Sequence, residues 1–212
     1  MSSYGARMDA RRRWNERYAQ PDREWLPETP AEWLVAHRDL LTGGGRALDV
    51  ACGDGRNALY LAQLGYMVDA IDVSDVAIDA LRATIEARGL TMTIAPRVVD
   101  LEREPLPSGP YDVIVMLNFL QRDLFEPTTQ ALAPDGLLLF ETLARAHVDE
   151  LGHSFNPAYL IERGELLDAF GHLEVVDHHE GVAQRSGSPR GVAGIVARRP
   201  ARALRRNAIR SP

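Results

Sequence analysis

Residues 47–57 contain the side chains with the clearest chemical meaning in this sequence. The segment reads Ala-Leu-Asp-Val-Ala-Cys-Gly-Asp-Gly-Arg-Asn, a short apolar run that ends in two glycines one residue apart. Glycine lets a turn bring backbone N–H groups and a helix start close to a ligand, because no Cβ stands in the way. Asp49 lies within the apolar run, and Asp72 and Asp100 follow later apolar runs. Carboxylates accept hydrogen bonds from hydroxyl and amino groups, so the pattern favours a nucleoside over a phosphate.

The same glycines also permit a dinucleotide-binding interpretation. Gly53-x-Gly55-x-x-Ala58 fits the loose G-x-G-x-x-A fingerprint, and Asp72 lies in the range expected for a ribose-binding acid. Three features count against this interpretation: Asp49 within the first strand, Asp100 after the third strand, and a closing hairpin in place of a second mononucleotide-binding half. An NAD-dependent oxidoreductase is therefore kept only as an alternative.

The elements that must position these residues alternate between strand and helix. Apolar runs predict strands at 46–51, 67–72, 93–100, 111–117 and 137–143. Periodic segments predict helices at 8–20, 30–41, 56–65, 74–88, 122–132 and 163–170. Two closing strands, 172–180 and 190–198, are expected to form a hairpin through the Gly-, Ser- and Pro-containing segment 181–191. The chain is thus predicted to be α/β, with a single Rossmann-like, doubly wound, seven-stranded sheet that is mostly parallel and has one antiparallel strand in the C-terminal hairpin.

Composition restricts the possible functions. The 212 residues are 45% hydrophobic, which suits a single globular domain, and no apolar run reaches membrane-spanning length. All 24 basic residues are arginine, which excludes a Walker phosphate loop, a Schiff-base enzyme and a lysine general base. Cys52 is the single cysteine and cannot form an intramolecular disulfide, so we expect a cytoplasmic protein.

Charge is unevenly distributed along the chain. The net charge is −6, yet residues 198–212 contain six arginines and no acid. The rest of the chain is therefore acidic, which disfavours nucleic-acid binding. Residues 199–212 are predicted to be a flexible basic tail.

Several motifs in register resemble the class I S-adenosylmethionine-dependent methyltransferases. They are Asp49-Val-Ala-Cys-Gly53-Asp-Gly55, Ala70-Ile-Asp72-Val-Ser74, Val99-Asp100-Leu101, Tyr111-Asp-Val-Ile-Val and Leu132-Ala-Pro-Asp-Gly136. Their order and spacing cover roughly residues 45–143. The resemblance implies S-adenosylmethionine as the cofactor, S-adenosylhomocysteine as the product, and no metal.

The resemblance also implies roles for individual residues. Asp72 would accept the two ribose hydroxyls and Asp100 the adenine amino group, while Asp49 would hold the first loop and reach the cofactor amino group. Backbone atoms of the glycine turn would approach the methionine part. The remaining expected cofactor-binding residues are Ala51, Cys52, Gly53, Gly55, Arg56, Asn57, Val73, Ser74, Leu101 and Leu117.

A narrower resemblance is to the small bacterial tellurite-resistance and thiopurine-type methyltransferases. It is carried by Gly55-Arg56-Asn57-Ala58-Leu-Tyr60-Leu, Trp14-Asn-Glu-Arg-Tyr18 and Phe155-Asn-Pro-Ala-Tyr159-Leu. It implies a soft thiol, chalcogen or anionic small molecule as methyl acceptor. Residues 1–42 would form a helical lid on a domain of residues 43–198, with Trp14 and Tyr18 over the cofactor; packing of that helix on the body is the alternative for both aromatic residues.

Candidates for acceptor contact are few. Asn118 follows the fourth predicted strand, and Arg122 would bind an anionic acceptor, cap a helix or form a salt bridge. One of the neighbouring residues His178 and His179 would face the pocket beside Arg185 or Arg190, with a solvated hairpin as the alternative. A shared metal ion is not expected, because neighbouring strand residues point to opposite faces. The sequence thus predicts a methyltransferase for a small-molecule acceptor, monomeric or homodimeric, without a membrane partner. A non-catalytic S-adenosylmethionine-binding or sensor protein is the second alternative.

Overall fold

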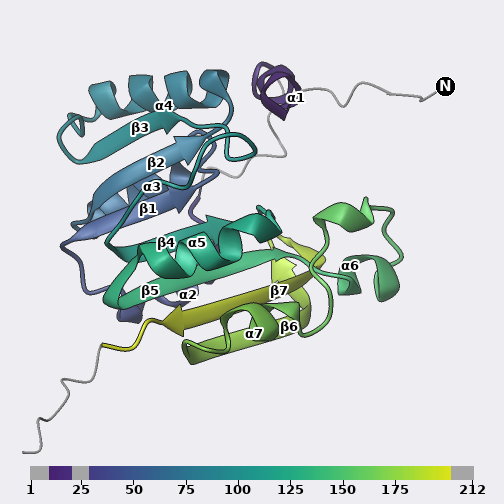
Figure 1. The fold of residues 1–212 in the computed structure, drawn as a ribbon. Coiled ribbons are helices and arrows are strands. Elements are labelled where there is room, and N and C mark those ends of the chain that lie inside the picture. Colours follow the sequence, from purple (N-terminus) through teal and green to yellow (C-terminus); the bar gives the residue numbers. More distant parts are fainter. Residues whose placement is uncertain (1–9, 21–28, 202–212) are drawn as a thin grey trace, which may run out of the picture.

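The structure, a computed structural model, describes residues 10–20 and 29–201 of the chain. Its centre is a seven-stranded sheet with the order β3-β2-β1-β4-β5-β7-β6 (Figure 1). The strands are β1 Arg46–Val50, β2 Met67–Asp72, β3 Ile94–Val98, β4 Tyr111–Leu117, β5 Leu132–Leu143, β6 Glu174–Arg185 and β7 Ser188–Arg198. Strand β7 runs antiparallel to β5 and β6, and the other neighbouring strands pair in parallel. The predicted doubly wound sheet is confirmed.

Helices cover both faces of the sheet. They are α1 Ala10–Tyr18, α2 Glu32–Ala36, α3 Arg56–Gln63, α4 Asp75–Ala87, α5 Phe125–Ala131, α6 Ala146–Asp149 and α7 Glu165–Phe170, with short 3-10 turns η1 Arg38–Leu40, η2 Arg122–Leu124 and η3 Pro157–Tyr159. Helices α2, α3 and α4 bury their apolar side chains on one face, and α5 and α7 on the other. Helix α1 lies beside α4 at the edge of this arrangement (Figure 1).

The central strands alternate between the two cores. In β1, Ala47 belongs to the core beneath α2–α4, whereas Leu48 and Val50 belong to the core beneath α5 and α7. Because both faces of β1 and β4 are covered, the two strands are almost continuously apolar. Asp49 in β1 is the buried exception, with 1% exposed surface, whereas Arg46 in β1 and Asp112 in β4 are exposed.

Some boundaries differ from the sequence expectations. The helix expected at 30–41 is divided at His37 into α2 and η1. Strand β5 begins at Leu132 instead of 137, because Leu132 pairs with Tyr111. The register then shifts before Val113 pairs with Leu137, and Pro134-Asp135-Gly136 lie in this irregular part. The hairpin link expected over 181–191 is only Ser186-Gly187, both with positive φ, as a two-residue turn requires. Pro189 is tolerated in β7 because β5 pairs with that strand only from Val192 onward.

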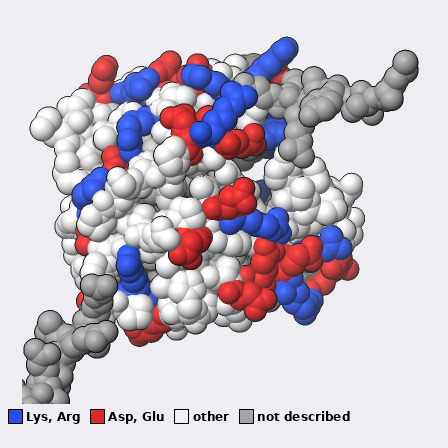
Figure 2. All heavy atoms as spheres, viewed as in Figure 1, with Lys and Arg blue, Asp and Glu red and all other residues white. Residues whose placement is uncertain are grey.

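The predicted basic tail is partly anchored. The Arg199 backbone is hydrogen-bonded to Asp135 and Gly136, and its guanidinium donates to the Leu132 carbonyl at 2.5 Å. Arg199 is therefore held in place, although it is the first residue of the tail predicted to be flexible. Residues 202–212 lie outside the described part. No helix among the described residues is long and apolar enough to cross a membrane. Acidic and basic side chains are intermixed over α1 and α4 on the face in Figure 2.

Candidate functional site

Two cavities lie at the edge of the sheet where β1, β2 and β4 end. The larger cavity has a volume of about 600 Å³ and the smaller about 240 Å³, and Ala51 lines both. Strands β1 and β4 are neighbours in the sheet although the chain leaves β1 toward β2, so this edge contains the topological switch point. Ligands of doubly wound proteins bind at such a point.

The glycine turn between β1 and α3 forms the floor between the cavities. Ala51, Gly53 and Gly55 all have positive φ, and Gly55 is the N-cap residue of α3. A Cβ on Gly55 would approach Leu81 Cδ1 to 2.3 Å. Gly55 lines neither cavity among those described. Its part is to let α3 begin close to α4, which leaves Gly53 at the surface of the smaller cavity.

Asp72 fixes this turn and faces the larger cavity. Its carboxylate accepts the Gly53 N–H at 2.9 Å and the Ser74 N–H at 2.8 Å, one on each oxygen. Each carboxylate oxygen has two lone pairs, so both oxygens retain an acceptor site for a ligand hydroxyl. The side chain is buried, and burial raises its pKa against the opposing effect of these backbone N–H groups.

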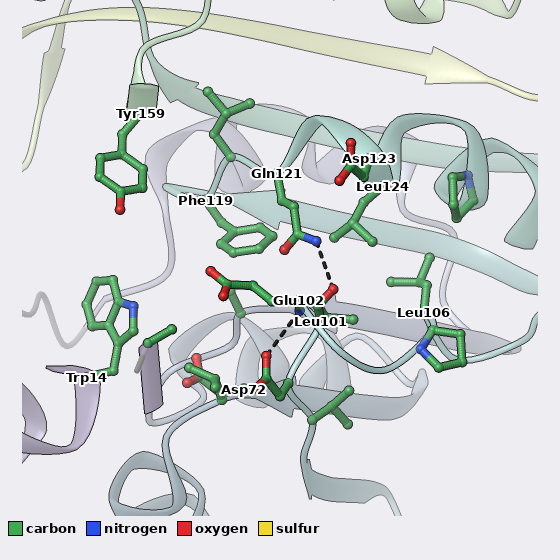
Figure 3. Close-up of a pocket in the computed structure, with 18 of the residues that line it drawn as sticks. Trp14, Asp72, Leu101, Glu102, Leu106, Phe119, Gln121, Asp123, Leu124 and Tyr159 are labelled. Atoms are coloured by element: carbon green, nitrogen blue, oxygen red, sulfur yellow. Dashed lines mark hydrogen bonds between the residues drawn. The ribbon is translucent and has the colours of Figure 1, made fainter. Parts of the chain in front are cut away.

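Asp100 occupies the equivalent place after β3. One carboxylate oxygen accepts the Glu102 N–H at 3.1 Å, and the side chain lines the larger cavity together with Leu101 and Val73. The Leu101 carbonyl accepts a hydrogen bond from Gln121 Nε2 at 2.8 Å, which ties this loop to the segment after β4 (Figure 3). The larger cavity therefore combines carboxylate acceptors with apolar walls, which suits a nucleoside.

Helix α1 supplies the outer wall of the larger cavity. Trp14 and Tyr159 face each other across its opening (Figure 3), and Arg13 donates to the Tyr159 hydroxyl at 3.2 Å. The helix is fixed to α4 by Asn15, which accepts from Ser74 Oγ at 2.8 Å and donates to Asp75. Trp14 lines the larger cavity, which agrees with the interpretation of α1 as a lid. Tyr18 is buried beside the smaller cavity, which agrees with packing of the helix on the body.

Asp49 is buried beneath the turn and lines neither cavity. One of its carboxylate oxygens has no hydrogen-bond partner in the part of the chain that the structure describes. Burial raises the pKa of Asp49 to about 7, although the Ala58 N–H and the Arg56 guanidinium oppose this shift. The free oxygen is an acceptor held ready for a donor from the turn or from a ligand.

The raised pKa of Asp49 makes a testable prediction about stability. The folded state keeps a proton that the unfolded chain releases near pH 4, so this contribution is complete below pH 4 and is lost as the pH rises through 7. In Asp49→Asn the amide stays neutral at both pH 5 and pH 8. The free energy of unfolding of this variant, measured relative to wild type, should therefore rise by about 2–3 kcal/mol from pH 5 to pH 8. Urea denaturation at both pH values measures this difference. Asp79→Asn on the exposed face of α4 is the control, and parallel pH profiles for wild type and Asp49→Asn would contradict the prediction.

Arg56 and Asn57 hold the chain ahead of α2. Arg56 donates to the Thr29 carbonyl at 2.9 Å, and Asn57 accepts the Ala31 N–H at 3.0 Å. Both also line the smaller cavity, as do Cys52, Gly53 and Leu117. The Cys52 thiol is buried, and burial raises its pKa, which disfavours a reactive thiolate.

Four further residues considered as ligand contacts also line neither cavity. Ser74 caps α4 by accepting the Ala77 N–H, and its side chain is fully buried. Arg122 forms two hydrogen bonds with Glu165, at 2.5 and 2.8 Å, so the salt-bridge alternative is the one that the geometry supports. His179 pairs with Gly194 and His178 with Ile195, on opposite faces of β6, and neither histidine lines the two cavities.

The smaller cavity contains acidic and basic side chains around Asn118. It is lined by Asn118 and Arg190 from the predicted set, and also by Glu141 and Arg185. Arg185 binds Glu141 through two nitrogens, with Nε at 2.9 Å and Nη2 at 2.5 Å from Oε2. Glu141 was not among the predicted site residues, although an acid within the apolar run Leu137–Leu143 was an available signal.

Residues 47–136 match the sequence family described as "Methyltransferase domain". This part of the chain is therefore similar to a methyltransferase domain. The seven-stranded sheet with the antiparallel β7 agrees with this similarity. No group of three or more His, Cys, Asp or Glu side chains in residues 10–20 and 29–201 is arranged to hold a metal ion.

Individual relatives of the methyltransferase domain are distant. A ubiquinone biosynthesis O-methyltransferase from Burkholderia vietnamiensis is 31% identical over 121 residues, which are 53% of this chain and 50% of the relative. The chain thus spans about half the length of the curated relatives it matches. TehB from Haemophilus influenzae has a TM-score of 0.67 at 22% identity, covering 79% of this chain and 61% of TehB. Magnesium protoporphyrin IX methyltransferase from Synechocystis with bound SAH has a TM-score of 0.57 at 19% identity, covering 79% and 78%. At these identities the structural likeness concerns the fold.

Proposed function

We propose that this chain transfers a methyl group from S-adenosylmethionine to a small-molecule acceptor. The observation that carries the proposal is the meeting of the two cavities at Ala51, above the Gly53 turn. A ligand that spans both would place its nucleoside against Asp72 and Asp100 and its amino-acid part beside Gly53. When bound, the cofactor supplies an electrophilic methyl group on a sulfonium.

The residues present fit this cofactor. Asp72 offers free lone pairs on two preorganised oxygens, and Asp100, which lines the same cavity, is a further acceptor. Apolar side chains form part of the walls of the larger cavity. A site from which water is excluded on ligand binding favours a displacement in which positive charge is lost. The chain's residues therefore act mainly by binding and orientation.

The test is binding followed by transfer. Calorimetry with S-adenosylhomocysteine and with NADH separates a methyltransferase from an oxidoreductase, and tight binding of NADH alone would reject the proposal. Transfer of labelled methyl to a panel of thiols, selenite, tellurite, thiopurines and small amines separates an enzyme from a sensor. A sensor would bind the nucleoside and label none of them.

The finer proposal is that the acceptor is soft or anionic, and Arg190 supports it. Arg185 is neutralised by Glu141, whereas the Arg190 side chain forms no ion pair or hydrogen bond with the described residues, and only its backbone is paired in the sheet. An unpaired guanidinium in a cavity favours an anion. A soft thiolate or selenolate also needs no general base at neutral pH. Glu141, the carboxylate beside Asn118, is already bound by Arg185.

Arg190→Gln tests the anionic part of this proposal. The loss of one charged hydrogen bond should lower kcat/KM for an anionic acceptor about 10- to 100-fold, while the affinity for S-adenosylhomocysteine stays within about threefold. Steady-state kinetics on an anionic and a neutral acceptor provide the measurement. Arg163→Gln is the matched control, because the Arg163 side chain is 81% exposed. Equal losses for both acceptors would contradict an anion-binding role.

We further propose that α1 acts as a lid over the nucleoside. Asn15→Ala removes the hydrogen bonds of Asn15 to Ser74 and Asp75, while the Arg11–Asp75 pair at 3.3 Å remains. This change should raise the dissociation rate of S-adenosylhomocysteine about fivefold, equivalent to one lost hydrogen bond. Stopped-flow fluorescence measures the rate. Arg12→Ala, which alters an exposed pair on the same helix, is the control. An unchanged dissociation rate would reduce α1 to a packing element.

A further inference from the structure

The larger cavity continues beyond the residues proposed to hold the nucleoside. Trp14, Tyr159 and Asp72 lie toward one end of the cavity, and Leu106 and Leu124 lie toward the other (Figure 3). Its volume of about 600 Å³ falls within the ~300–1,000 Å³ range of sites for drug-sized ligands. An adenosine group is smaller than such ligands, so part of the cavity is left for another group.

The end of the cavity around Leu106 is apolar. It is formed by Pro105 and Leu106 from the loop after β3 and by Leu124 and Pro127 from η2 and α5. Leu106 is only partly buried although it packs against the core, so apolar surface is exposed inside a concave site. Asp123 also lines the cavity, but its side chain is exposed to solvent.

The loop that contains Leu106 is held by two hydrogen bonds. The Asp100 N–H donates to Glu104 at 3.0 Å, and the Leu101 carbonyl accepts from Gln121 at 2.8 Å. These bonds fix the loop relative to β4 while leaving the apolar side chains free to contact a ligand. The apolar end is thus built by two segments that are already tied together.

We propose that this apolar end is a subsite for an apolar group on the amino edge of the nucleobase, as in N6-alkyl or N6-aralkyl adenosine ligands. The inference rests on the proposed function, which places the adenine amino group at Asp100. Leu106 and Leu124 line the same cavity as Asp100, on the side away from Trp14 and Tyr159 (Figure 3), so this apolar end is the space that a substituent on that amino group would occupy. A singly substituted amino group keeps one N–H, which still donates to the Asp100 carboxylate.

Calorimetry with S-adenosylhomocysteine and its N6-benzyl derivative tests the subsite. Wild type should bind the benzyl derivative within about threefold of the parent, because apolar burial offsets the ordering of the added group. Leu106→Trp fills the end of the cavity and should shift the affinity ratio against the benzyl derivative by about tenfold or more. Met67→Trp is the control and should keep the wild-type ratio. Met67 is 53% exposed and lies at the opposite edge of the sheet.

Each outcome decides the proposal. A benzyl derivative that binds wild type more than about tenfold more weakly than the parent overturns the subsite and leaves the proposed function standing. Failure of wild type to bind S-adenosylhomocysteine overturns the proposed function and the subsite with it. If Leu106→Trp does not fold, Leu106→Ala replaces it: the larger cavity should then favour an N6-naphthylmethyl derivative over the benzyl one, and an unchanged preference would reject the subsite.

Discussion

Asp72→Ala is expected to lower the affinity for S-adenosylhomocysteine by at least about 100-fold, because two charge-assisted hydrogen bonds to the ligand are lost at ~1.5–3 kcal/mol each. The substitution also leaves the Gly53 and Ser74 N–H groups without their acceptor. The turn that separates the two cavities should therefore lose its fixed conformation. Calorimetry on the folded variant measures the affinity, and circular dichroism checks the fold.

Asp72→Asn separates the two contributions to this effect. The amide keeps the volume and one acceptor oxygen, but its NH₂ group must face either the Gly53 or the Ser74 N–H. We therefore expect an affinity between those of wild type and the alanine variant. Asp79→Ala, whose side chain is 70% exposed on α4, is the matched control. Binding by Asp72→Ala within about threefold of wild type would remove Asp72 from the cofactor site.

Gly191→Ala is expected to have the largest effect on stability. A Cβ at Gly191 would lie 1.9 Å from the backbone nitrogen of His147 and 2.3 Å from the carbonyl carbon of Ala146. Neither atom is the end of a flexible side chain, so α6 must move away from β7. Gly191 also donates to His147 Nδ1 at 3.3 Å, and this bond would be lost with the displacement. We expect the free energy of unfolding to fall by about 3 kcal/mol, the upper end of overpacking costs.

Gly187→Ala in the same hairpin is the control for Gly191→Ala. Gly187 has a φ of +75° and nothing within 4 Å of an added Cβ, so only backbone strain of about 1 kcal/mol is expected. Urea denaturation compares the two variants. Because Arg190 precedes Gly191, the first variant should also raise KM for an anionic acceptor more than it weakens cofactor binding. Equal stability of the two variants would contradict the predicted backbone clash.

The sequence predicted the alternating strands and the doubly wound sheet because each strand has its own local pattern. The run around Val113 and Ile114 had to be buried on both faces, and turns at Gly53 and Gly89 have their own residue preferences. The closing hairpin was harder to predict. Gly181, Ser186 and Pro189 have the composition of a loop, and only pairing with the neighbouring strand extends β6 and β7 through them.

Residue type and spacing by themselves determined which side chains end neighbouring strands, and hence that Asp72 and Asp100 meet beside the Gly53–Gly55 turn. Tertiary structure decided what else reaches that edge. Glu165 draws Arg122 away from the cavities, and Glu141 neutralises Arg185 but not Arg190. These partners are separated by 43 or 44 residues in the chain. Local sequence patterns report on neighbours within a turn or a strand, whereas ion pairing and the apolar end at Leu106 depend on contacts that only the packed sheet creates.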